Sequence, residues 1–299
     1  MSAESQFKIH RLRREELPHD TIKLARFLIG KVVVHDLPCG RLSGRIVEAE
    51  AYPPGDPAGH HFRGPTPRIR SMYLPPGHAY VYFNYGAHFM LNVASEPEGV
   101  AGGILIRALD PLDGVEWMRR HRVAQVGRAK VESSSKISRK VADQVGGAIS
   151  RETVRGTARE TANGLAHKIV RKEELALLDL TRGPGRVAAA LQIDRRHDGV
   201  DLCGEDSALW LGELVEQQRA SDSHAVSGRR ITRKGTRTIV ARTVRIGISR
   251  AADKLLRFYE RGNPFVSGPK RLLLPANPLP AAKKSAHKTK RCKSEARAT

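Results

Sequence analysis

The chain has 299 residues, 40% of them hydrophobic, which is enough for a packed core and excludes wholesale disorder. Its 52 Lys and Arg against 31 Asp and Glu give a formal net charge of +21. This excess points to a polyanionic partner, either nucleic acid or an acidic membrane surface, unless it serves solubility alone. No run approaches the roughly 18 apolar residues of a membrane span, and the N-terminus lacks the apolar core of a signal peptide.

Cysteine usage predicts the compartment. Cys39, Cys203 and Cys292 lie far apart in the sequence and show no metal-ligand spacing. We therefore expect a reduced, cytoplasmic location, with neither a disulfide framework nor a zinc site.

The predicted elements begin with a helix that Asp20 caps and Gly30 ends. Strands are expected at 31–37 and 44–52, followed by a Pro- and Gly-rich loop at 53–78, a hairpin at 80–92 and an apolar strand at 102–109. Asp110-Pro111 is typical of a helix cap with a first-turn proline. A helix at 186–193 and strands at 243–249 and 255–260 complete an α+β (mixed α/β) domain with a curved, mainly antiparallel sheet flanked by helices.

Basic residues concentrate in three places: about 123–172, about 216–240 and the tail. They interrupt or follow the apolar segments 7–122, 173–215 and 241–274. This interleaving predicts one domain that carries basic insertions. The first insertion is either a solvated linker or an added contact to DNA.

The strand at 44–52 carries two carboxylates and a phenol on one face. Glu48, Glu50 and Tyr52 alternate with Val47, Ala49 and Ala51. Taken alone, the polar face would be a solvated outer surface. However, residues 52–89 hold a disproportionate share of the aromatics, and aromatic rings beside a carboxylate in a basic protein suggest a nucleobase pocket.

The loop that follows contains further candidates. His60-His61 is either a surface pair or part of a base pocket, in which a neutral imidazole offers a donor and an acceptor. Arg63, Arg68 and Arg70 follow, either as a solvated loop or as phosphate contacts.

The segment YVYFNYGAHFMLN places three of the six tyrosines within a hairpin. Tyr80 and Tyr82 share one face, and Asn92 on the returning strand can point the same way. Core packing would account for Tyr80 and Tyr82 but not for Tyr85 at the turn. A rigid aromatic there is suited to enter the minor groove and fill the gap left by an unstacked nucleotide.

Six ordered blocks resemble the alkyladenine DNA glycosylase family, the 3-methyladenine glycosylases of the mammalian type. They are RIVEAEAY (45–52), HFRGPTPRIRSMY (61–73), the hairpin, ILIRALDPLDGVEWMR (104–119), GPGRVAAAL (183–191) and LRFYERGNPFVS (256–267). The resemblance implies an N-terminal arm at 1–17, a glycosylase domain at 18–268 with a protruding, DNA-intercalating hairpin, and a basic tail at 269–299. It also implies a monofunctional base excision repair enzyme that needs no metal or other cofactor.

The resemblance assigns roles to residues at matching positions. Glu50 falls on the catalytic general base, and Arg107 on the arginine that holds the neighbouring phosphate and orders the water. Tyr52 and Tyr82 fall on the residues that sandwich the flipped base, and His61 on the side chain that donates to it.

Two further positions complete the carried-over site. Tyr85 matches the intercalating tyrosine, and Asn92 the residue that discourages normal guanine. Glu48 receives no role and is treated as structural.

The expected substrate is duplex DNA that contains alkylated purines, approached through the minor groove by a monomer associated with the nucleoid. 3-Methyladenine and 7-methylguanine are the expected lesions, with hypoxanthine and ethenoadenine left open. The alternatives are a non-catalytic nucleic-acid-binding protein on the same fold and, from charge alone, an RNA- or ribosome-associated protein.

Overall fold

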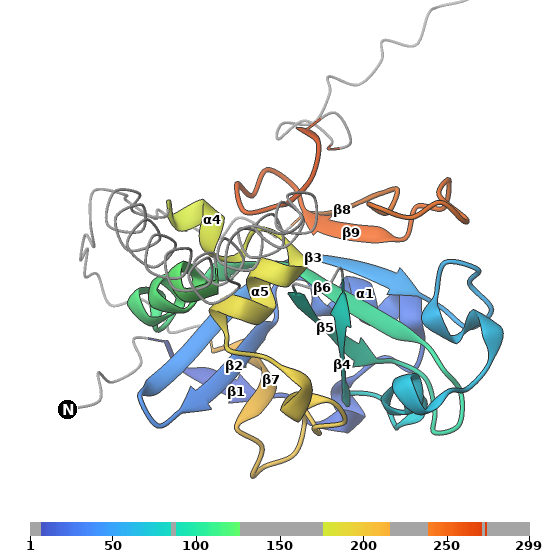
Figure 1. The fold of residues 1–299 in the computed structure, drawn as a ribbon, viewed down its shortest axis with the longest axis horizontal. Coiled ribbons are helices and arrows are strands. Elements are labelled where there is room, and N and C mark those ends of the chain that lie inside the picture. Colours follow the sequence, from blue (N-terminus) through green and yellow to red (C-terminus); the bar gives the residue numbers. More distant parts are fainter. Residues whose placement is uncertain (1–6, 85–87, 126–175, 216–238, 271–272, 274–299) are drawn as a thin grey trace, which may run out of the picture.

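The computed structural model describes residues 7–84, 88–125, 176–215, 239–270 and 273 (Figure 1). In these residues, nine strands form a single antiparallel sheet with the order β1-β7-β2-β3-β6-β5-β4, and β9 joins β3 to β8. The sheet curls and is flanked by helices. The α+β class predicted from the sequence is therefore confirmed.

The first edge of the sheet comes from the N-terminus. β1 (Ile9–Arg11) pairs with β7 (Leu209–Leu214), which in turn pairs with β2 (Val32–Leu37). Leu12 and Leu17 are buried in the main core. The sheet thus includes residues that the resemblance assigned to an N-terminal arm.

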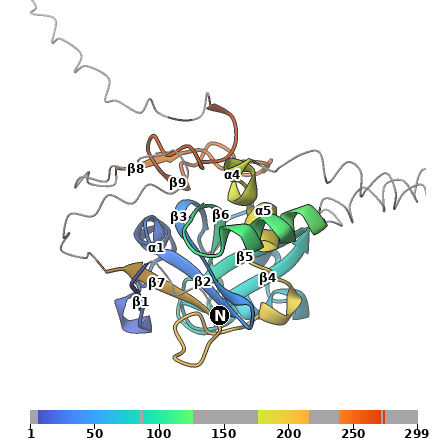
Figure 2. The ribbon, with the colours of Figure 1, turned by 90° about the vertical axis from the view of Figure 1, so that its left-hand side faces the viewer.

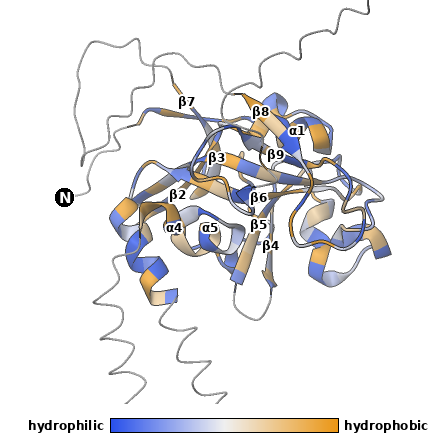
Figure 3. Ribbon diagram, turned by 90° about the horizontal axis from the view of Figure 1, so that it is seen from above, coloured by the Kyte–Doolittle hydropathy of each residue, from blue (hydrophilic) through white to orange (hydrophobic). Residues whose placement is uncertain are grey.

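Helix α1 (Thr21–Leu28) begins where the sequence predicts. The Asp20 side chain accepts a hydrogen bond from the Lys23 backbone N–H at 2.7 Å, a cap that stabilises a helix by about 0.5–2 kcal/mol. Gly30, with a φ of 94°, follows the helix end. The helix is amphipathic (Figure 3), and its buried residues pack in the main core with those of β3.

Strand β3 (Gly40–Tyr52) is the centre of the sheet. It pairs with β2, with β6 (Gly103–Pro111) and, near its end, with β9 (Arg257–Glu260). The register against β6 shifts on both sides of Glu48, so the strand carries a bulge there.

The bulge changes the expected alternation of side chains. Ala49 and Ala51 lie in the main core, as predicted, but Val47 packs in a separate cluster with Tyr259 and Phe265. Placing Val47 on the same face as Ala49 was wrong, because strict two-residue alternation does not hold across a bulge.

β4 (Ala79–Asn84) and β5 (His88–Ala94) pair antiparallel, with Asn84 opposite His88. Tyr80 lies directly opposite Asn92. Residues 85–87, and with them the predicted wedge Tyr85, lie outside the described residues.

The predicted start of one helix and one predicted strand are wrong. Asp110 and Pro111 do not open a helix; they end β6 and pair with Arg45 and Gly44 of β3, and helical residues begin only at 115 and run to 125. A proline is tolerated at this strand end because its missing N–H removes no ladder bond that the interior needs.

The second is the strand expected at 243–249. The structure has β8 (Val240–Thr243) followed by a loop in which Gly247 adopts a φ of 76°. The loop turns inward, because Arg245 is buried against Asp56.

The remaining helices cover the sheet. α4 (Leu177–Thr181) precedes α5 (Pro184–Ala190), which corresponds to the helix expected at 186–193 and packs against β5 and β6 (Figure 2). Among the residues that the structure describes, four short 3-10 helices lie in the connections: η1 (Arg14–Glu16), η2 (His60–Arg63), η3 (Pro67–Tyr73) and η4 (Arg195–His197). Most of both basic insertions and nearly all of the tail lie outside the described residues.

Candidate active site

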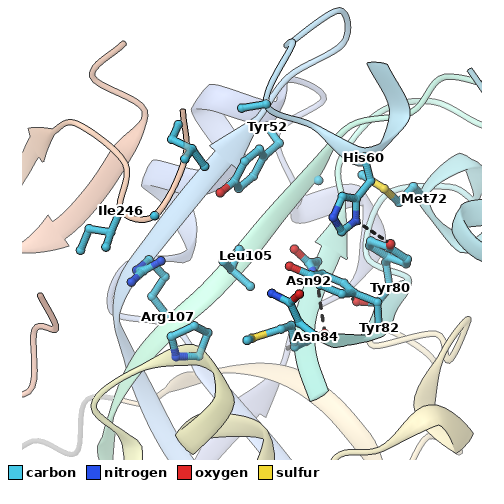
Figure 4. Close-up of a pocket in the computed structure, with 16 residues that line it drawn as sticks. Tyr52, His60, Met72, Tyr80, Tyr82, Asn84, Asn92, Leu105, Arg107 and Ile246 are labelled. Carbon is cyan, nitrogen blue, oxygen red and sulfur yellow. Dashed lines mark hydrogen bonds between the residues drawn. The ribbon is translucent and has the colours of Figure 1, made fainter. Parts of the chain in front are cut away.

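A cavity of about 430 Å³ opens where the end of β3, the β4–β5 pair, β6 and the loop after β8 meet. Figure 4 shows Arg107 and Ile246 on one side and His60, Tyr80 and Tyr82 on the other, with Tyr52 at the end of β3. Its size and its mixture of aromatic, apolar and a few polar groups are typical of a small-molecule pocket.

Aromatic rings form one wall. Tyr80 and Tyr82 are stacked, with ring centroids 5.3 Å apart, and His60 meets Tyr82 edge-on at 4.5 Å. His60 Nδ1 and the Tyr80 hydroxyl are hydrogen-bonded at 2.9 Å. Burial, followed by the charges of Arg68 and His61, holds the pKa of His60 below its usual range. The imidazole on this wall is therefore neutral at neutral pH.

The structure places His60 at the cavity instead of His61. His61 Nε2 is hydrogen-bonded to the Pro53 carbonyl at 2.9 Å, and its Nδ1 has no partner among the described residues. Successive side chains of a 3-10 helix point about a third of a turn apart, so one member of the pair faces the cavity and the other faces the loop. His60 thus lines the cavity and His61 does not, while the base-contacting role that the resemblance gives to His61 stays a prediction.

Asn92 lies on the cavity wall, as predicted, and is only 5% exposed. Its Nδ2 donates to the Tyr80 carbonyl at 3.1 Å. This bond across the two strands fixes the amide, so its position depends on the pairing of β4 with β5.

Tyr52 also lines the cavity, and two charged groups hold it. Its hydroxyl donates to Glu50 Oε2 at 3.0 Å, and the Arg245 guanidinium lies over its ring, 4.6 Å from the centroid. Burial, reinforced by the charge of Glu50, raises the pKa of Tyr52 well above its ordinary value. The phenol therefore stays protonated and remains a donor to the carboxylate.

Glu50 and Arg107 lie together in the interior. Arg107 Nη1 is 3.1 Å from Glu50 Oε2, and the Ile246 backbone N–H donates to Glu50 Oε1 at 2.8 Å. Glu50 is fully buried, so the solvated-face interpretation of this strand was wrong. Burial alone would lower the pKa of Arg107, but Glu50 and then Glu48 outweigh it and raise that pKa.

Glu50 itself is not part of the cavity lining; Tyr52 and Arg107, which both contact it, are. The carboxylate thus lies one side chain behind the wall. Its charge acts on the cavity through Tyr52 and Arg107.

The chain was compared with known proteins. The sequence model described as methylpurine-DNA glycosylase matches residues 15–264. The chain belongs to the methylpurine-DNA glycosylase family. It is thereby a DNA repair enzyme, a hydrolase that acts on N-glycosyl compounds.

Three relatives illustrate the similarity to this family. A protein of Mesorhizobium japonicum, provisionally named as a 3-methyladenine DNA glycosylase, is 44% identical over 87% of this chain and 92% of its own length. One of Paraburkholderia phytofirmans with the same provisional name is 38% identical over 90% of this chain and 93% of its own. The DNA-3-methyladenine glycosylase of Homo sapiens is 33% identical over 86% of this chain and 68% of its own.

Sequence reasoning missed part of the site of this family member. Asp56 and Arg245 form a fully buried ion pair, and Arg245 Nη1 also donates to the Ala51 carbonyl at 2.9 Å. Neither residue lies in a recognisable sequence pattern. Asp56 falls in the loop expected at 53–78, and Arg245 in the strand expected at 243–249, which the structure does not form. The inward loop after β8 is what brings Arg245 to Tyr52 and the Ile246 N–H to Glu50.

No group of three or more His, Cys, Asp or Glu side chains in the described part of the chain is arranged to hold a metal ion. None of the helices in that part has the length and apolar character needed to cross a bilayer.

Proposed function

We propose that the protein is a monofunctional DNA glycosylase that removes alkylated purines, such as 3-methyladenine and 7-methylguanine, from duplex DNA. It approaches the minor groove as a monomer in the cytoplasm, takes the damaged nucleotide into the cavity and hydrolyses its N-glycosidic bond to leave an abasic site. The observation that carries this proposal is the contact of Arg107, on the cavity wall, with the buried carboxylate of Glu50, in a chain of this family.

The aromatic groups support recognition of the base. Tyr52 and Tyr82 come from different strands and both line the cavity, which suits them to stack on the two faces of a flipped purine. Stacking a cationic alkylated base on phenol rings adds selectivity on the cation–π scale of roughly 0.5–2 kcal/mol. His60 takes the role of lateral hydrogen-bond partner, and Asn92 that of excluding normal guanine.

Glu50 acts as the general base in this proposal. A carboxylate offers about four lone-pair sites. The described residues contribute two hydrogen-bond donors, the Tyr52 hydroxyl on Oε2 and the Ile246 N–H on Oε1, and Arg107 Nη1 forms an ion pair with Oε2. Oε1 therefore retains a lone pair for a water molecule. That water loses its proton to Glu50 as it attacks C1′ of the deoxyribose.

The leaving group explains why one carboxylate suffices. An N3- or N7-alkylated purine already carries a positive charge and departs as a neutral base when C1′ gains oxocarbenium character, so no general acid is needed. Neutral lesions such as hypoxanthine and ethenoadenine require a proton as they leave. Since no lysine lines the cavity in the described part of the chain, water is the nucleophile and the strand is not cleaved.

Tyr85 completes the proposal as the wedge. It lies in the sequence between the paired strands β4 and β5, whose Tyr82 and Asn92 line the cavity. A ring inserted there would replace part of the stacking lost when the nucleotide leaves the duplex, which amounts to a few kcal/mol per step. Tyr85→Ser should therefore reduce the preference for lesion-containing over intact duplex, and an unchanged preference would contradict the wedge.

The test of the function is base release from methylated duplex DNA under single-turnover conditions, with the freed purines separated by chromatography. Glu50→Gln should slow release by roughly 10²–10⁴-fold while its affinity for lesion duplex is retained. Glu213→Gln is a matched control, because Glu213 pairs with Lys31 far along the sheet from the cavity. Absence of release by the wild-type protein, with DNA binding intact, would favour the non-catalytic alternative.

A further inference from the structure

A buried cluster of charges lies directly behind the cavity wall. It contains two carboxylates, Glu48 and Glu50, and two guanidiniums, Arg107 and Arg257. Glu48 and Arg257 are fully buried, and Arg107 is 7% exposed. Glu48 therefore shares its arginine with the proposed general base, although it does not touch the cavity itself.

Arg107 divides its donors between the two carboxylates. Its Nε donates to Glu48 Oε1 at 2.9 Å, and its Nη1 lies 3.1 Å from Glu50 Oε2. An arginine that faces a single carboxylate commonly forms two parallel hydrogen bonds to it. Here Nε is bonded to Glu48, so the pair of parallel hydrogen bonds that Nε and an Nη would form with Glu50 is not made.

Glu48 is held more firmly than the arginine that it orients. Arg257 Nε donates to its Oε1 at 2.7 Å, the Ser267 backbone N–H to its Oε2 at 2.6 Å, and the Ser267 hydroxyl to Oε1 at 3.0 Å. The bulge of β3 lies at Glu48 and turns its side chain toward this cluster. The anchor is thus built from β3, β9 and the segment that follows β9.

We propose that Glu48 is a positioning residue for the glycosidic step, acting on Glu50 through Arg107; this inference rests on the proposed function. Glu48 holds Nε of the Arg107 guanidinium in a hydrogen bond of its own, which leaves an acceptor site on Glu50 open to the attacking water. Without the carboxylate at position 48, Arg107 turns onto Glu50 as a two-bond pair. The general base is then occupied by the arginine that should assist it.

Glu48→Gln tests this directly. The amide keeps the size of the side chain but replaces one acceptor oxygen with a donor, which cannot face Arg107 Nε or the Ser267 N–H. The single-turnover rate of base release should fall by about 10²-fold, the scale of a misplaced catalytic group, for cationic and neutral lesions alike. The dissociation constant for lesion duplex should change by less than about threefold, since a tenfold change corresponds to 1.4 kcal/mol of binding.

The matched control is Glu260→Gln, which alters a second, partly buried ion pair between the same two strands. Glu260 of β9 pairs with Arg45 of β3 and contacts none of the groups in the cluster. This variant should release bases at the wild-type rate when both proteins show the same thermal unfolding midpoint. A wild-type rate in Glu48→Gln, or an equal loss in the two variants, would overturn the proposal.

Ser267→Ala decides the matter if Glu48→Gln does not fold. It removes the hydroxyl that donates to Glu48 and that also lies 3.5 Å from Arg107 Nη2, while the backbone N–H bond to Glu48 remains. A reduction of about threefold to tenfold in release rate with unchanged affinity supports the positioning role, and an unchanged rate overturns it. Failure of the wild-type protein to release any base would instead reject the proposed function itself.

Discussion

Breaking the buried Asp56–Arg245 ion pair is expected to cause a large loss in the free energy of unfolding. Both side chains are fully buried, and Arg245 forms two bonds to the carboxylate, through Nη1 to Oδ2 and through Nη2 to Oδ1 at 3.1 Å. Arg245→Met leaves the Asp56 charge in the interior without its partner. Breaking such a pair costs about 3–5 kcal/mol, because the remaining charge keeps its desolvation penalty.

The expected loss can be followed as an unfolding transition. At about 2–4 °C per kcal/mol for a domain of this size, Arg245→Met should lower the unfolding midpoint by roughly 6–20 °C. Arg250→Met is the matched control, since Arg250 is an exposed arginine of the same loop, and its effect should stay within about 0.5 kcal/mol.

A double-mutant cycle separates the pair from general damage to the loop. Asp56→Asn combined with Arg245→Met removes both charges, so the double variant should be more stable than the sum of the single losses predicts, by about 2–3 kcal/mol. Urea unfolding at pH 7, followed by circular dichroism, measures all four proteins. Additivity within about 0.5 kcal/mol, or equal losses in Arg245→Met and Arg250→Met, would refute the reasoning.

Three further predictions follow from the cavity and its surroundings. His60→Ala should weaken the preference for lesion duplex by about twofold to tenfold, the scale of one hydrogen bond. His61→Ala should lower stability without changing that preference, and binding titrations that show the reverse would favour His61 as the residue that contacts the base. Burial lowers the pKa of His35, so the unfolded chain takes up the proton first as the pH falls below about 6.5. The free energy of unfolding should therefore decrease by up to about 1.4 kcal/mol per pH unit. His35→Asn should show a shallower dependence of this free energy on pH in denaturant titrations between pH 7.5 and 5.5. A Cβ on Gly103 would lie 3.1 Å from Met72 Cε inside the cavity wall, so Gly103→Val should weaken lesion binding by about 5- to 100-fold through overpacking, with no change for intact duplex.

Local patterns predicted the elements on which the site is built. Asp20 and Gly30 bound a helix because capping and a left-handed glycine are local properties of the chain. Alternation within β4 placed Tyr80 and Tyr82 on the cavity side for the same reason, since neighbouring residues in a strand face opposite ways.

Errors arose where a residue's position depends on partners far away in the sequence. The strand expected at 243–249 does not form, because two of its residues bond to groups elsewhere in the fold. Arg245 pairs with Asp56, and the Ile246 N–H donates to Glu50. The bulge at Glu48 is likewise invisible in a period-two pattern, although the cluster with Arg107 depends on it. Both departures lie at the site, where tertiary contacts outweigh local preference.

The resemblance to a family predicted what local patterns could not, but only at the resolution of its motifs. It placed Glu50 and Arg107 together, 57 residues apart in sequence, and the structure brings them to 3.1 Å. It assigned the base contact to His61, through the block that begins at that residue, whereas the structure places His60 on the cavity wall. Which of the two side chains faces the cavity depends on the turn of η2, a geometric property that a motif does not encode.

The net charge of the chain and the charges of the site serve different steps. The buried carboxylates behind the cavity are balanced one for one by guanidiniums, so the site contributes nothing to the net charge of +21: Glu48, Glu50 and Asp56 face Arg107, Arg257 and Arg245. Surface cations attract phosphate across solvent and are screened within about 8–10 Å at moderate salt. A cavity with uncompensated positive charge would repel an alkylated purine, which is itself a cation. In the proposed function, a neutral interior in a protein of positive net charge would attract the polyanion and still admit the cationic base.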